Sequence, residues 1–344
     1  MTGKKEYDWS KVCFQQFLIK FSYMGTNYQG VAYQDEDTPT VEREIFRVLI
    51  LTKMIKSREA SNFSRCGRTD TGVHAAGNYM SISLRASPQI DHLAVANKLL
   101  PRDIRLLALR PVDEKFSARF KCRHRVYKYF QPVWEGLDVA AMDRAAQRLV
   151  GEHDFRNFCK MDVAATTNFK RKIFSLQFHL DESKSMLEIQ VNGNAFLWHQ
   201  IRCIVAILLL VGEGVEKESL VSDLLDIDLF PRKPLYPLAD PSGLVLFDCF
   251  FDNIEPPFAA SECTDSLKAH RAHLAETLRM ASVLQAINRL DHTGSLAQWT
   301  DRNKHTPVST RGTCPSLEEK LESRKRKLTL MDADDDTEDS GNLV

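Results

Sequence analysis

Several common sequence signals are missing from this chain of 344 residues. Lys plus Arg and Asp plus Glu are equal at 46 each, so the net charge says nothing about an anionic partner. The eight cysteines are scattered without a Cys-x-x-Cys pair, which gives zinc-ribbon and redox-motif interpretations little support. There is also no P-loop, no Gly-x-Gly-x-x-Gly string and no cluster with metal-ligand spacing. The sequence therefore offers no signal for a nucleotide cofactor or a metal.

Long hydrophobic runs are missing too. The longest, at residues 201–211, is interrupted by Arg202 and is far too short to span a bilayer. The first residues carry charges and lack the apolar stretch of a secretory signal, and the scattered cysteines suit a reducing compartment. We therefore expect a protein of the nucleus or cytoplasm with no membrane partner. With 43% hydrophobic and 27% charged residues, it has the ordinary composition of a globular protein.

The spacing of apolar residues predicts a mixture of strands and helices. Strands are expected at residues 17–23, 78–84, 126–133, 173–179, 186–191 and 244–251. Helices are expected at residues 40–56, 91–99, 139–150, 195–211 and 217–225. Such a mixture is typical of an α+β fold.

Composition changes along the chain predict five segments. Residues 1–14 are expected to be a tail, 15–110 a first α+β half, 111–254 a second α+β half, 255–303 a helical extension and 304–344 a disordered charged tail. Within the extension, residues 264–290 have the pattern of an amphipathic helix. Within the tail, the basic run at 324–327 precedes an acidic run at 332–339, and neither can bury enough apolar surface to offset its ordering entropy.

The segment at residues 67–74 has the strongest functional pattern in the chain. Gly67 and Gly72 bracket one guanidinium, Arg68, and one carboxylate, Asp70, and the imidazole of His74 follows. Glycine permits backbone angles that other residues avoid and lets a ligand approach the backbone closely. By itself such a string is more often a solvated surface turn, because loops are commonly polar.

This segment resembles the G-R-T-D-x-G-V-H active-site loop of the TruA family of tRNA pseudouridine synthases. Further blocks that resemble the family follow in its order at residues 116–120, 125–129, 151–155, 193–202 and 239–246. One departure is Asp240, which stands where a proline is usual, whereas the Gly-Leu-x-Leu that begins at Gly243 is intact. The resemblance covers residues 15–252. Residues 158–163 and 168–171 look most like the eukaryotic branch that acts on positions 38 and 39 of the anticodon stem-loop.

The resemblance implies that uridine is isomerised to pseudouridine in tRNA without a cofactor or metal. The bond from C1′ to N1 is broken, the uracil rotates, and C5 is joined to C1′. Asp70 would either attack C1′ or remove the 2′ proton, and Arg202 would pair with it and keep it ionised. Arg68 would help to extrude the nucleotide from its stem, which costs a few kcal/mol. Tyr127 would stack on the flipped uracil, although a half-buried strand aromatic is its ordinary interpretation.

Further substrate contacts follow from the same resemblance and from local charge. Leu244 and His199 are implied to bind substrate, although His74 and His199 are by themselves more typical of hydrogen-bonded structural histidines. Cations crowd residues 119–128 at Arg119, Lys121, Arg123, His124, Arg125 and Lys128. On a strand, most of them would share one face and could follow a line of phosphates. A solvated surface is the ordinary interpretation of any single basic run.

The fold implied is an α+β pseudouridine synthase core of two ferredoxin-like halves with a basic cleft between them, assembled as a homodimer. Two other classes of protein stay open. One is a catalytically silent tRNA-binding or chaperone protein of the same fold, against which Asp70, Tyr127 and Arg202 argue. The other is an aspartate-based nucleoside hydrolase, against which the basic residues at 119–128 argue. Formation of pseudouridine in labelled tRNA separates the three.

Overall fold

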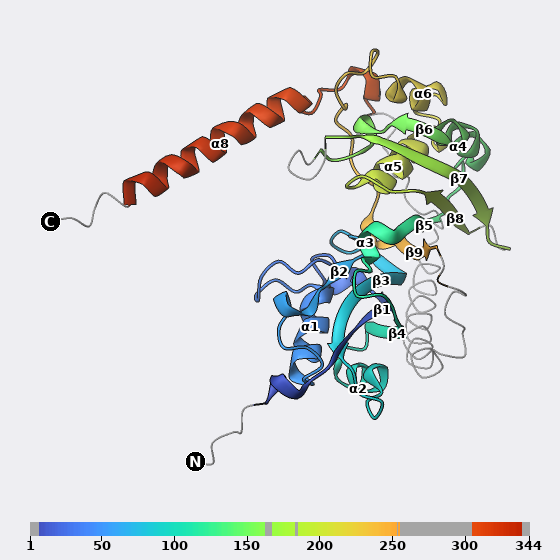
Figure 1. Ribbon diagram of the computed structural model, residues 1–344. Helices are drawn as coiled ribbons and strands as arrows, with labels where there is room; N and C mark the ends of the chain where they lie inside the picture. The colour runs from blue at the N-terminus through green and yellow to red at the C-terminus, as the bar shows by residue number, and fades with distance from the viewer. Residues whose placement is uncertain (1–6, 162–166, 183–184, 253, 255–304, 339–344) are drawn as a thin grey trace, which may run out of the picture. The chain divides into compact units, whose positions relative to one another are not determined.

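The computed structural model describes residues 7–161, 167–182, 185–252, 254 and 305–338, with side chains described as far as residue 328 (Figure 1). The helix expected at 264–290 therefore lies outside the described residues. The chain divides into two compact units, the first made of residues 1–135, 177–194 and 240–297 and the second of 136–176, 195–239 and 298–344. This division differs from the expected break near residue 111, because strands that follow residue 111 pair with strands of the first unit.

A mixed sheet forms the first unit. In order across the sheet, its strands are β4 (Ile104–Pro111), β1 (Phe14–Tyr23), β3 (His74–Arg85), β9 (Leu244–Phe251), β5 (Cys122–Pro132) and β8 (Met186–Gly193), with the short β2 (Ser64–Arg65) beside β3. The β3–β9 pair is parallel, whereas β1–β3, β1–β4, β2–β3, β5–β8 and β5–β9 are antiparallel. The α+β class predicted from the sequence is confirmed at this coarse level.

Two helices pack beside these strands. Helix α1 (Val41–Leu51) begins after Thr40, whose hydroxyl accepts a hydrogen bond from the Arg43 amide at 3.2 Å. Helix α2 (His92–Leu99) begins after Asp91, which caps it through the Ala94 amide at 2.9 Å. Strand β1 is buried at successive positions, Leu18 and Ile19, so both of its faces are covered. This burial explains why β1 shows a continuous apolar run in place of alternation.

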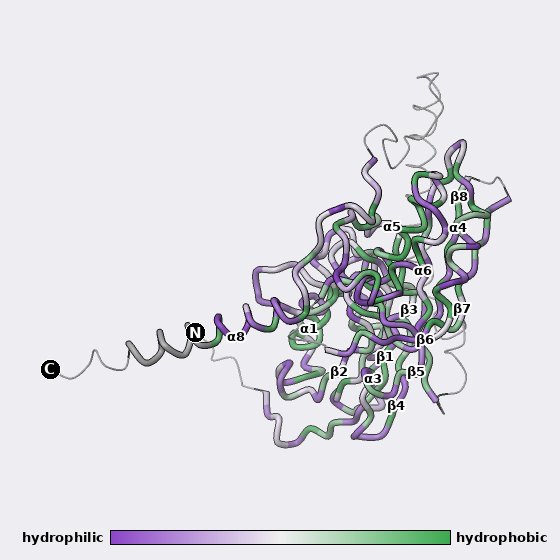
Figure 2. Tube along the Cα trace, turned by 90° about the horizontal axis from the view of Figure 1, so that it is seen from above, coloured by the Kyte–Doolittle hydropathy of each residue, from purple (hydrophilic) through white to green (hydrophobic). Residues whose placement is uncertain are grey.

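The second unit contains α4 (Val139–Ala146), α5 (Gln200–Gly212), α6 (Ser219–Leu225) and the antiparallel pair of β6 (Gly151–Asp154) with β7 (Lys170–Leu180). Residues 177–180 of β7 are grouped with the first unit. Helix α5 is buried along nearly its whole length, as its hydropathy in Figure 2 suggests. It begins at Gln200 and not at residue 195 as expected, because His199 has a left-handed backbone (φ 63°) that interrupts the helix.

Residues 305–338 differ from the disordered tail that was expected at 304–344. Helix α8 (Leu317–Glu338) follows Ser316, whose hydroxyl accepts from the Glu319 amide at 3.1 Å while the Glu319 carboxylate accepts from the Ser316 amide at 2.8 Å. This reciprocal pair is a capping box. Glu319 also pairs with Arg232 at 3.0 Å, and the Lys320 ammonium donates to the Met161 carbonyl at 3.1 Å. The capping box and these two side-chain contacts stabilise the first turn of α8. A prediction from composition alone does not include them.

No helix among the described residues is both long enough and apolar enough to cross a membrane.

We expect Gly212→Val to destabilise the second unit. A Cβ atom at Gly212 would lie 2.6 Å from the Cγ and Sδ atoms of Met142 on α4 and 2.9 Å from Leu137 Cδ1. Overpacking of this kind costs about 1–3 kcal/mol of the free energy of unfolding, which denaturant titration measures. Gly212→Ala is the matched control and should lose less, because it adds one carbon and gains helix propensity. Equal stability of wild type and Gly212→Val would contradict the close packing of α4 on α5.

Candidate active site

A buried amide holds the start of the 67–74 loop. Asn78 on β3 is fully buried, and its side-chain oxygen accepts from the Gly67 amide while its nitrogen donates to the Gly67 carbonyl, both at 3.0 Å. The Asn78 nitrogen also donates to the Tyr23 hydroxyl at 3.3 Å, and that hydroxyl lies 2.7 Å from the Thr69 hydroxyl. Burial raises the pKa of Tyr23, so the hydroxyl stays protonated. One strand on each side, β3 and β1, therefore positions the loop.

The outer side of the loop is held by backbone hydrogen bonds. The Thr69 carbonyl accepts from the Val31 amide at 3.2 Å, and the Gly72 amide donates to the Tyr28 carbonyl at 3.3 Å. The Val73 amide donates to the Asp70 carbonyl at 3.2 Å, which closes a turn, and Gly72 has a φ of +78° that favours glycine there. Asp70 is thus presented on a turn with both flanks fixed, and its side chain is half-buried.

Tyr127 is brought close to this loop by the order of the strands. Ala75 on β3 pairs with Leu246 on β9, and Leu246 pairs with Tyr127 on β5, so the three lie in one row across the sheet. Burial, above all, raises the pKa of the Tyr127 hydroxyl, and the negative charge of Asp70 raises it further. Leu244, at the start of β9, is also buried. The structure therefore brings Asp70 within electrostatic range of Tyr127, and Leu244 lies in the same unit, opposite Tyr129 on β5.

His74 has a structural environment. Its Nδ1 accepts from the Gly25 amide at 3.0 Å, and the backbone of Ser242 is a second hydrogen-bond partner. Burial lowers the pKa of His74, so the ring is neutral at neutral pH. The structure agrees with the ordinary interpretation of this residue as a structural histidine.

Arg202 and His199 lie in the second unit. The Arg202 Nε donates to the Ala239 carbonyl at 2.7 Å, and the Ala239 amide donates back to the Arg202 carbonyl at 3.3 Å. Burial lowers the pKa of His199 to about 4, and the positive charge of Arg202 adds to this shift. The proposed ion pair of Arg202 with Asp70 stays a prediction.

The basic residues at 119–128 do not all lie on one strand, which corrects the expected common strand face. Their contact with phosphate stays a prediction. Arg119 belongs to a single helical turn, α3 (Ala118–Lys121), and the strand begins only at Cys122. Arg123 pairs with Asp252, and Lys128 pairs with Glu188 at 2.7 Å. The Arg125 guanidinium donates to the carbonyls of Cys66 and Asn194. These partners are distant in sequence, so local charge alone could not predict that Arg123, Arg125 and Lys128 have partners within the protein.

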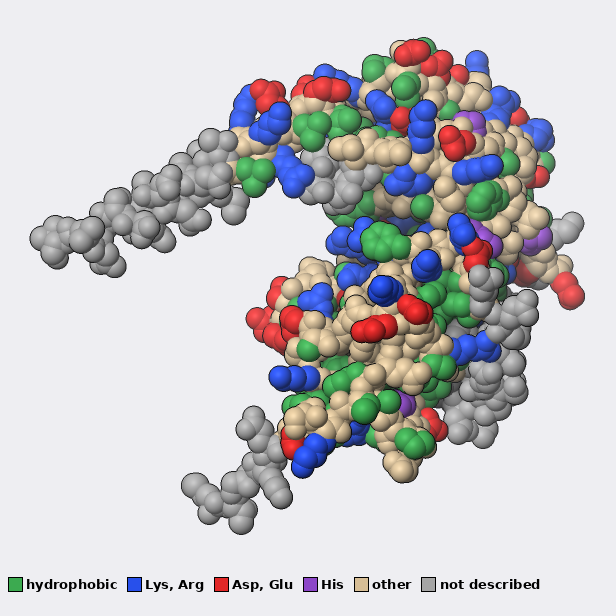
Figure 3. Space-filling view, viewed as in Figure 1, with side chains coloured by type: hydrophobic (Ala, Val, Ile, Leu, Met, Phe, Trp, Pro, Cys, Tyr) green, Lys and Arg blue, Asp and Glu red, His purple; other side chains and the backbone are tan. Residues whose placement is uncertain are grey.

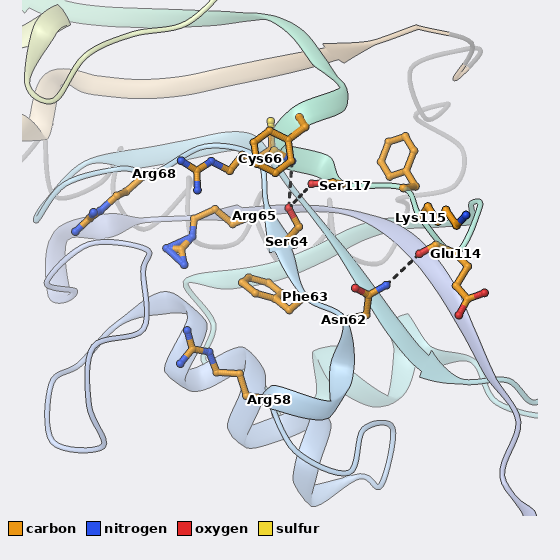
Figure 4. A pocket seen from close by; sticks show the side chains of 13 residues that line it. Arg58, Asn62, Phe63, Ser64, Arg65, Cys66, Arg68, Glu114, Lys115 and Ser117 are labelled. Atoms are coloured by element: carbon orange, nitrogen blue, oxygen red, sulfur yellow. Dashed lines mark hydrogen bonds between the residues drawn. The ribbon is translucent and has the colours of Figure 1, made fainter. Parts of the chain in front are cut away.

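A basic pocket that sequence analysis missed lies beside the loop. It has a volume of about 740 Å³ and is lined by Arg58, Arg65, Arg68, Lys115 and Arg119, with Glu114 as its one lining carboxylate and with Phe63, Phe116 and Phe120 among its apolar walls. Figure 4 shows the side chains of Arg58, Arg65 and Arg68 on one side of the pocket. On the face seen in Figure 3, Lys and Arg side chains gather around α3.

Electrostatics make this pocket a site for anions. The buried Glu42 pairs with Arg65 at 2.9 Å and accepts from the Tyr33 amide at 2.8 Å, so it holds Arg65 in place. Burial lowers the pKa of Arg65, and the charges of Arg68, Arg58 and Arg119 lower it further although Glu42 opposes them. The cations therefore repel one another across the pocket, and a bound phosphate would relieve that repulsion. No local cluster of charge in the sequence indicates this pocket, because Arg58, Arg65 and Arg119 come from separate segments of the chain.

Comparison with known proteins places the chain in a family. A family model described as tRNA pseudouridine synthase matches residues 145–252. The tRNA pseudouridine(38/39) synthase of Mus musculus is 34% identical over 93% of this chain and 78% of its own length. The proteins of the same name in Homo sapiens and Saccharomyces cerevisiae are each 41% identical over 73% of this chain. The chain therefore belongs to the tRNA pseudouridine synthase family.

Coverage of these relatives is partial. The chain spans 59% of the human protein and 61% of the yeast protein. Among solved structures, one of an unknown protein from Galdieria sulphuraria aligns at 12% identity over 59% of this chain and 94% of its own, with a TM-score of 0.17.

We expect His199 to make the protein less stable in mild acid. Its folded pKa of about 4 lies below the ordinary value, so its contribution to stability is fully present above about pH 6.5 and is lost as the pH falls toward 4. His199→Asn should flatten the fall of unfolding free energy over this range, because asparagine tolerates the left-handed backbone and does not titrate. Thermal or denaturant unfolding at several pH values measures the slope. His179→Asn, on the exposed end of β7, is the control. Equal slopes of unfolding free energy against pH for wild type and His199→Asn would contradict the lowered pKa of His199.

Proposed function

We propose that the protein isomerises uridine to pseudouridine in tRNA, at positions 38 and 39 of the anticodon stem-loop. The observation that carries the proposal is the placement of Asp70 on a fixed turn beside Tyr127, with a buried amide holding the start of the loop. Relatives named tRNA pseudouridine(38/39) synthase at 34–41% identity support the substrate. No observation on the described residues favours a catalytically silent protein.

Asp70 supplies the reactive group in this proposal. Its carboxylate either attacks C1′ or removes the 2′ proton, and in both cases the bond from C1′ to N1 breaks. The freed uracil rotates and C5 bonds to C1′. In the first case this new bond displaces the carboxylate from C1′, and in the second case the 2′ proton is returned. The C5 proton is lost and N1 gains a proton, so that the product is an isomer of the substrate. Its half-buried position gives the carboxylate access to substrate while limiting the water around it.

Tyr127 and Leu244 form the wall against which the uracil rests. Tyr127 is buried and its pKa is raised, so at neutral pH its side chain is a neutral phenol that can stack on the base and donate a hydrogen bond. Leu244 adds an apolar surface at the start of β9. These two side chains favour a flat base of limited size. These two side chains do not by themselves distinguish uracil from other bases. In this proposal, that selection depends on how the base fits against Asp70 and the loop backbone.

In this proposal, the basic pocket beside the loop binds the phosphates of the tRNA. Arg68 lines it two residues before Asp70, so a strand whose phosphates lie in the pocket places a nucleotide next to the carboxylate. Phe120 is 79% exposed, and the Arg119 guanidinium lies 5.4 Å from the centre of its ring. An exposed aromatic beside cations is typical of surfaces that stack an unpaired base. Such stacking would help to keep the target nucleotide outside its stem.

Further parts of the proposal rest on the family resemblance. We infer that Arg202 pairs with Asp70 and that His199 contacts substrate as a neutral ring. We also infer two ferredoxin-like halves, assembly as a homodimer, and residence in the nucleus or cytoplasm, with the basic run at 324–327 as an import signal or additional RNA contact. Sedimentation of the full chain tests the dimer, and a monomer at all concentrations would contradict it.

We expect Asp70→Asn to slow single-turnover pseudouridine formation by at least about a thousandfold while tRNA affinity stays within a few-fold. The substitution keeps the shape of the side chain but removes the nucleophile or base, and such a loss raises the barrier by several kcal/mol. Pseudouridine is measured in digested, labelled tRNA. Asp113→Asn changes an exposed carboxylate of the same unit and serves as control. A rate for Asp70→Asn within about tenfold of wild type would overturn the role of Asp70.

We expect Arg119→Ala to weaken tRNA binding in a salt-dependent way. If Arg119 contacts a phosphate, its removal lowers the slope of log affinity against log salt by about one. Arg123→Ala is the matched control, because Arg123 pairs with Asp252 and is not among the residues that line the pocket. Its slope should stay that of wild type. Filter binding or fluorescence anisotropy at several salt concentrations measures both, and the reverse result would place the RNA along β5 and not in the pocket.

A further inference from the structure

Three cysteine thiols meet beside the start of the catalytic loop. Cys66 directly precedes Gly67, Cys122 begins β5 and Cys249 lies on β9. Their three sulfur atoms all lie within 4.8 Å of one another. In the described part of the chain, they form the single such group of three or more His, Cys, Asp or Glu side chains. Their wide separation in the sequence explains why no metal-ligand spacing was evident there.

The sheet holds the three positions in place. The Cys66 amide donates to the Tyr79 carbonyl at 2.8 Å, which ties it to β3. On the neighbouring strands, Cys122 is opposite Phe251, and Cys249 is opposite Arg125. Cys66 and Cys249 are buried at 5% and 3% exposure, whereas Cys122 is half-exposed. The thiols are therefore preorganised by the backbone, with access from solvent on the Cys122 side.

We propose that Cys66, Cys122 and Cys249 bind one thiophilic divalent cation of the Zn²⁺ type, with the fourth coordination position open to solvent. Metal–sulfur distances of about 2.3 Å place tetrahedral thiolates roughly 3.8 Å apart, so only a small contraction of the cluster is needed. Thiolate ligands select soft and borderline cations such as Zn²⁺ and Cu⁺.

Charge balance favours a divalent ion over a monovalent one. The Arg125 guanidinium donates to the Cys66 carbonyl at 3.2 Å and is close enough to interact electrostatically with all three thiols. Three thiolates, a divalent cation and one guanidinium sum to zero charge. With Cu⁺ the same group would keep a buried negative charge, which is costly in a low-dielectric interior. Arg125, taken from the sequence as an RNA contact, has in this proposal the role of a charge partner to the metal site.

The site would be structural, and it does not depend on the proposed function. A metal joined to Cys66 would fix the residue that precedes Gly67 and link it to β5 and β9, the strands that carry Tyr127 and Leu246. The loop would then be held at its start by Asn78 on one side and by the metal on the other. No reacting atom of the substrate needs to touch the ion.

The test is direct metal binding to the reduced, full-length chain. Zn²⁺ is titrated against a chromophoric chelator, and Cd²⁺ is titrated while the thiolate charge-transfer absorption is followed. We expect one equivalent of each metal. Cys122→Ser should lower the affinity by more than about 100-fold, since even the loss of a residue that only supports a ligand costs about 10–100-fold. Cys13→Ser, which changes an exposed cysteine outside the cluster, should bind as wild type does.

An Arg125 variant and peptide mapping of the three cysteines test the metal site further. Arg125→Gln should weaken Zn²⁺ binding by about 10–100-fold while circular dichroism shows a folded protein. Unchanged affinity in Cys122→Ser, or no thiolate absorption with Cd²⁺, would overturn the proposal. So would peptide mapping that finds a disulfide between two of the three cysteines together with no metal uptake after reduction. That result would assign the cluster to thiol oxidation.

Discussion

The hydrogen bonds between the Asn78 side chain and the backbone of Gly67 are the constraint on which the site depends. A buried amide can satisfy one backbone donor and one backbone acceptor at once, so it fixes both the position and the orientation of the peptide it meets. The same amide reaches Tyr23, and Tyr23 reaches Thr69, so one network spans the loop up to the residue before Asp70. Because every member is buried, loss of one partner leaves the others unsatisfied, which is more costly than the loss of a surface hydrogen bond.

The sequence predicted those features whose cause is local. The closing strand at Leu244–Phe251 was predicted with the bounds that the structure gives it. The helix expected from residue 40 begins directly after Thr40, which caps it. The contiguous string at residues 67–74 identified the loop and the family, because its glycines, carboxylate and guanidinium all lie in one short stretch of sequence. The pairing of Asp70 with Arg202 stays a prediction from resemblance.

Features that depend on distant partners could not be predicted in this way. Lys128 has the charge of an RNA contact, but Glu188 on the neighbouring strand pairs with it. Arg65 on β2 and Arg119 on α3 are unremarkable in the sequence and come to one pocket because β2, β3 and α3 pack together. Arg58, which directly precedes the short helix at Glu59–Ser61, joins them because that helix packs on β3. The ordered start of α8 was not predicted, because the expectation for residues 304–344 rested on composition and did not include the ion pair of Glu319 with Arg232. In each case, the prediction rested on the type of a single residue, whereas the role of that residue depends on a partner far away in the sequence.

The parallel pairing of β3 with β9 has a consequence for the order in which this molecule can fold. Strand β3, which follows the Asp70 loop, has β9, the last strand of the sheet in sequence, as its neighbour. Ala75 therefore pairs with Leu246, although most of the described chain separates these two residues in sequence. Contacts between such distant residues are entropically expensive to form and slow to nucleate. During synthesis, the row of Ala75, Leu246 and Tyr127 cannot form until residues 244–251 have been made, so Tyr127 and the loop are not held side by side before then. A nascent chain therefore exposes the edges of β3 and β5 until β9 enters between them, which is the stage at which aggregation competes most strongly with folding.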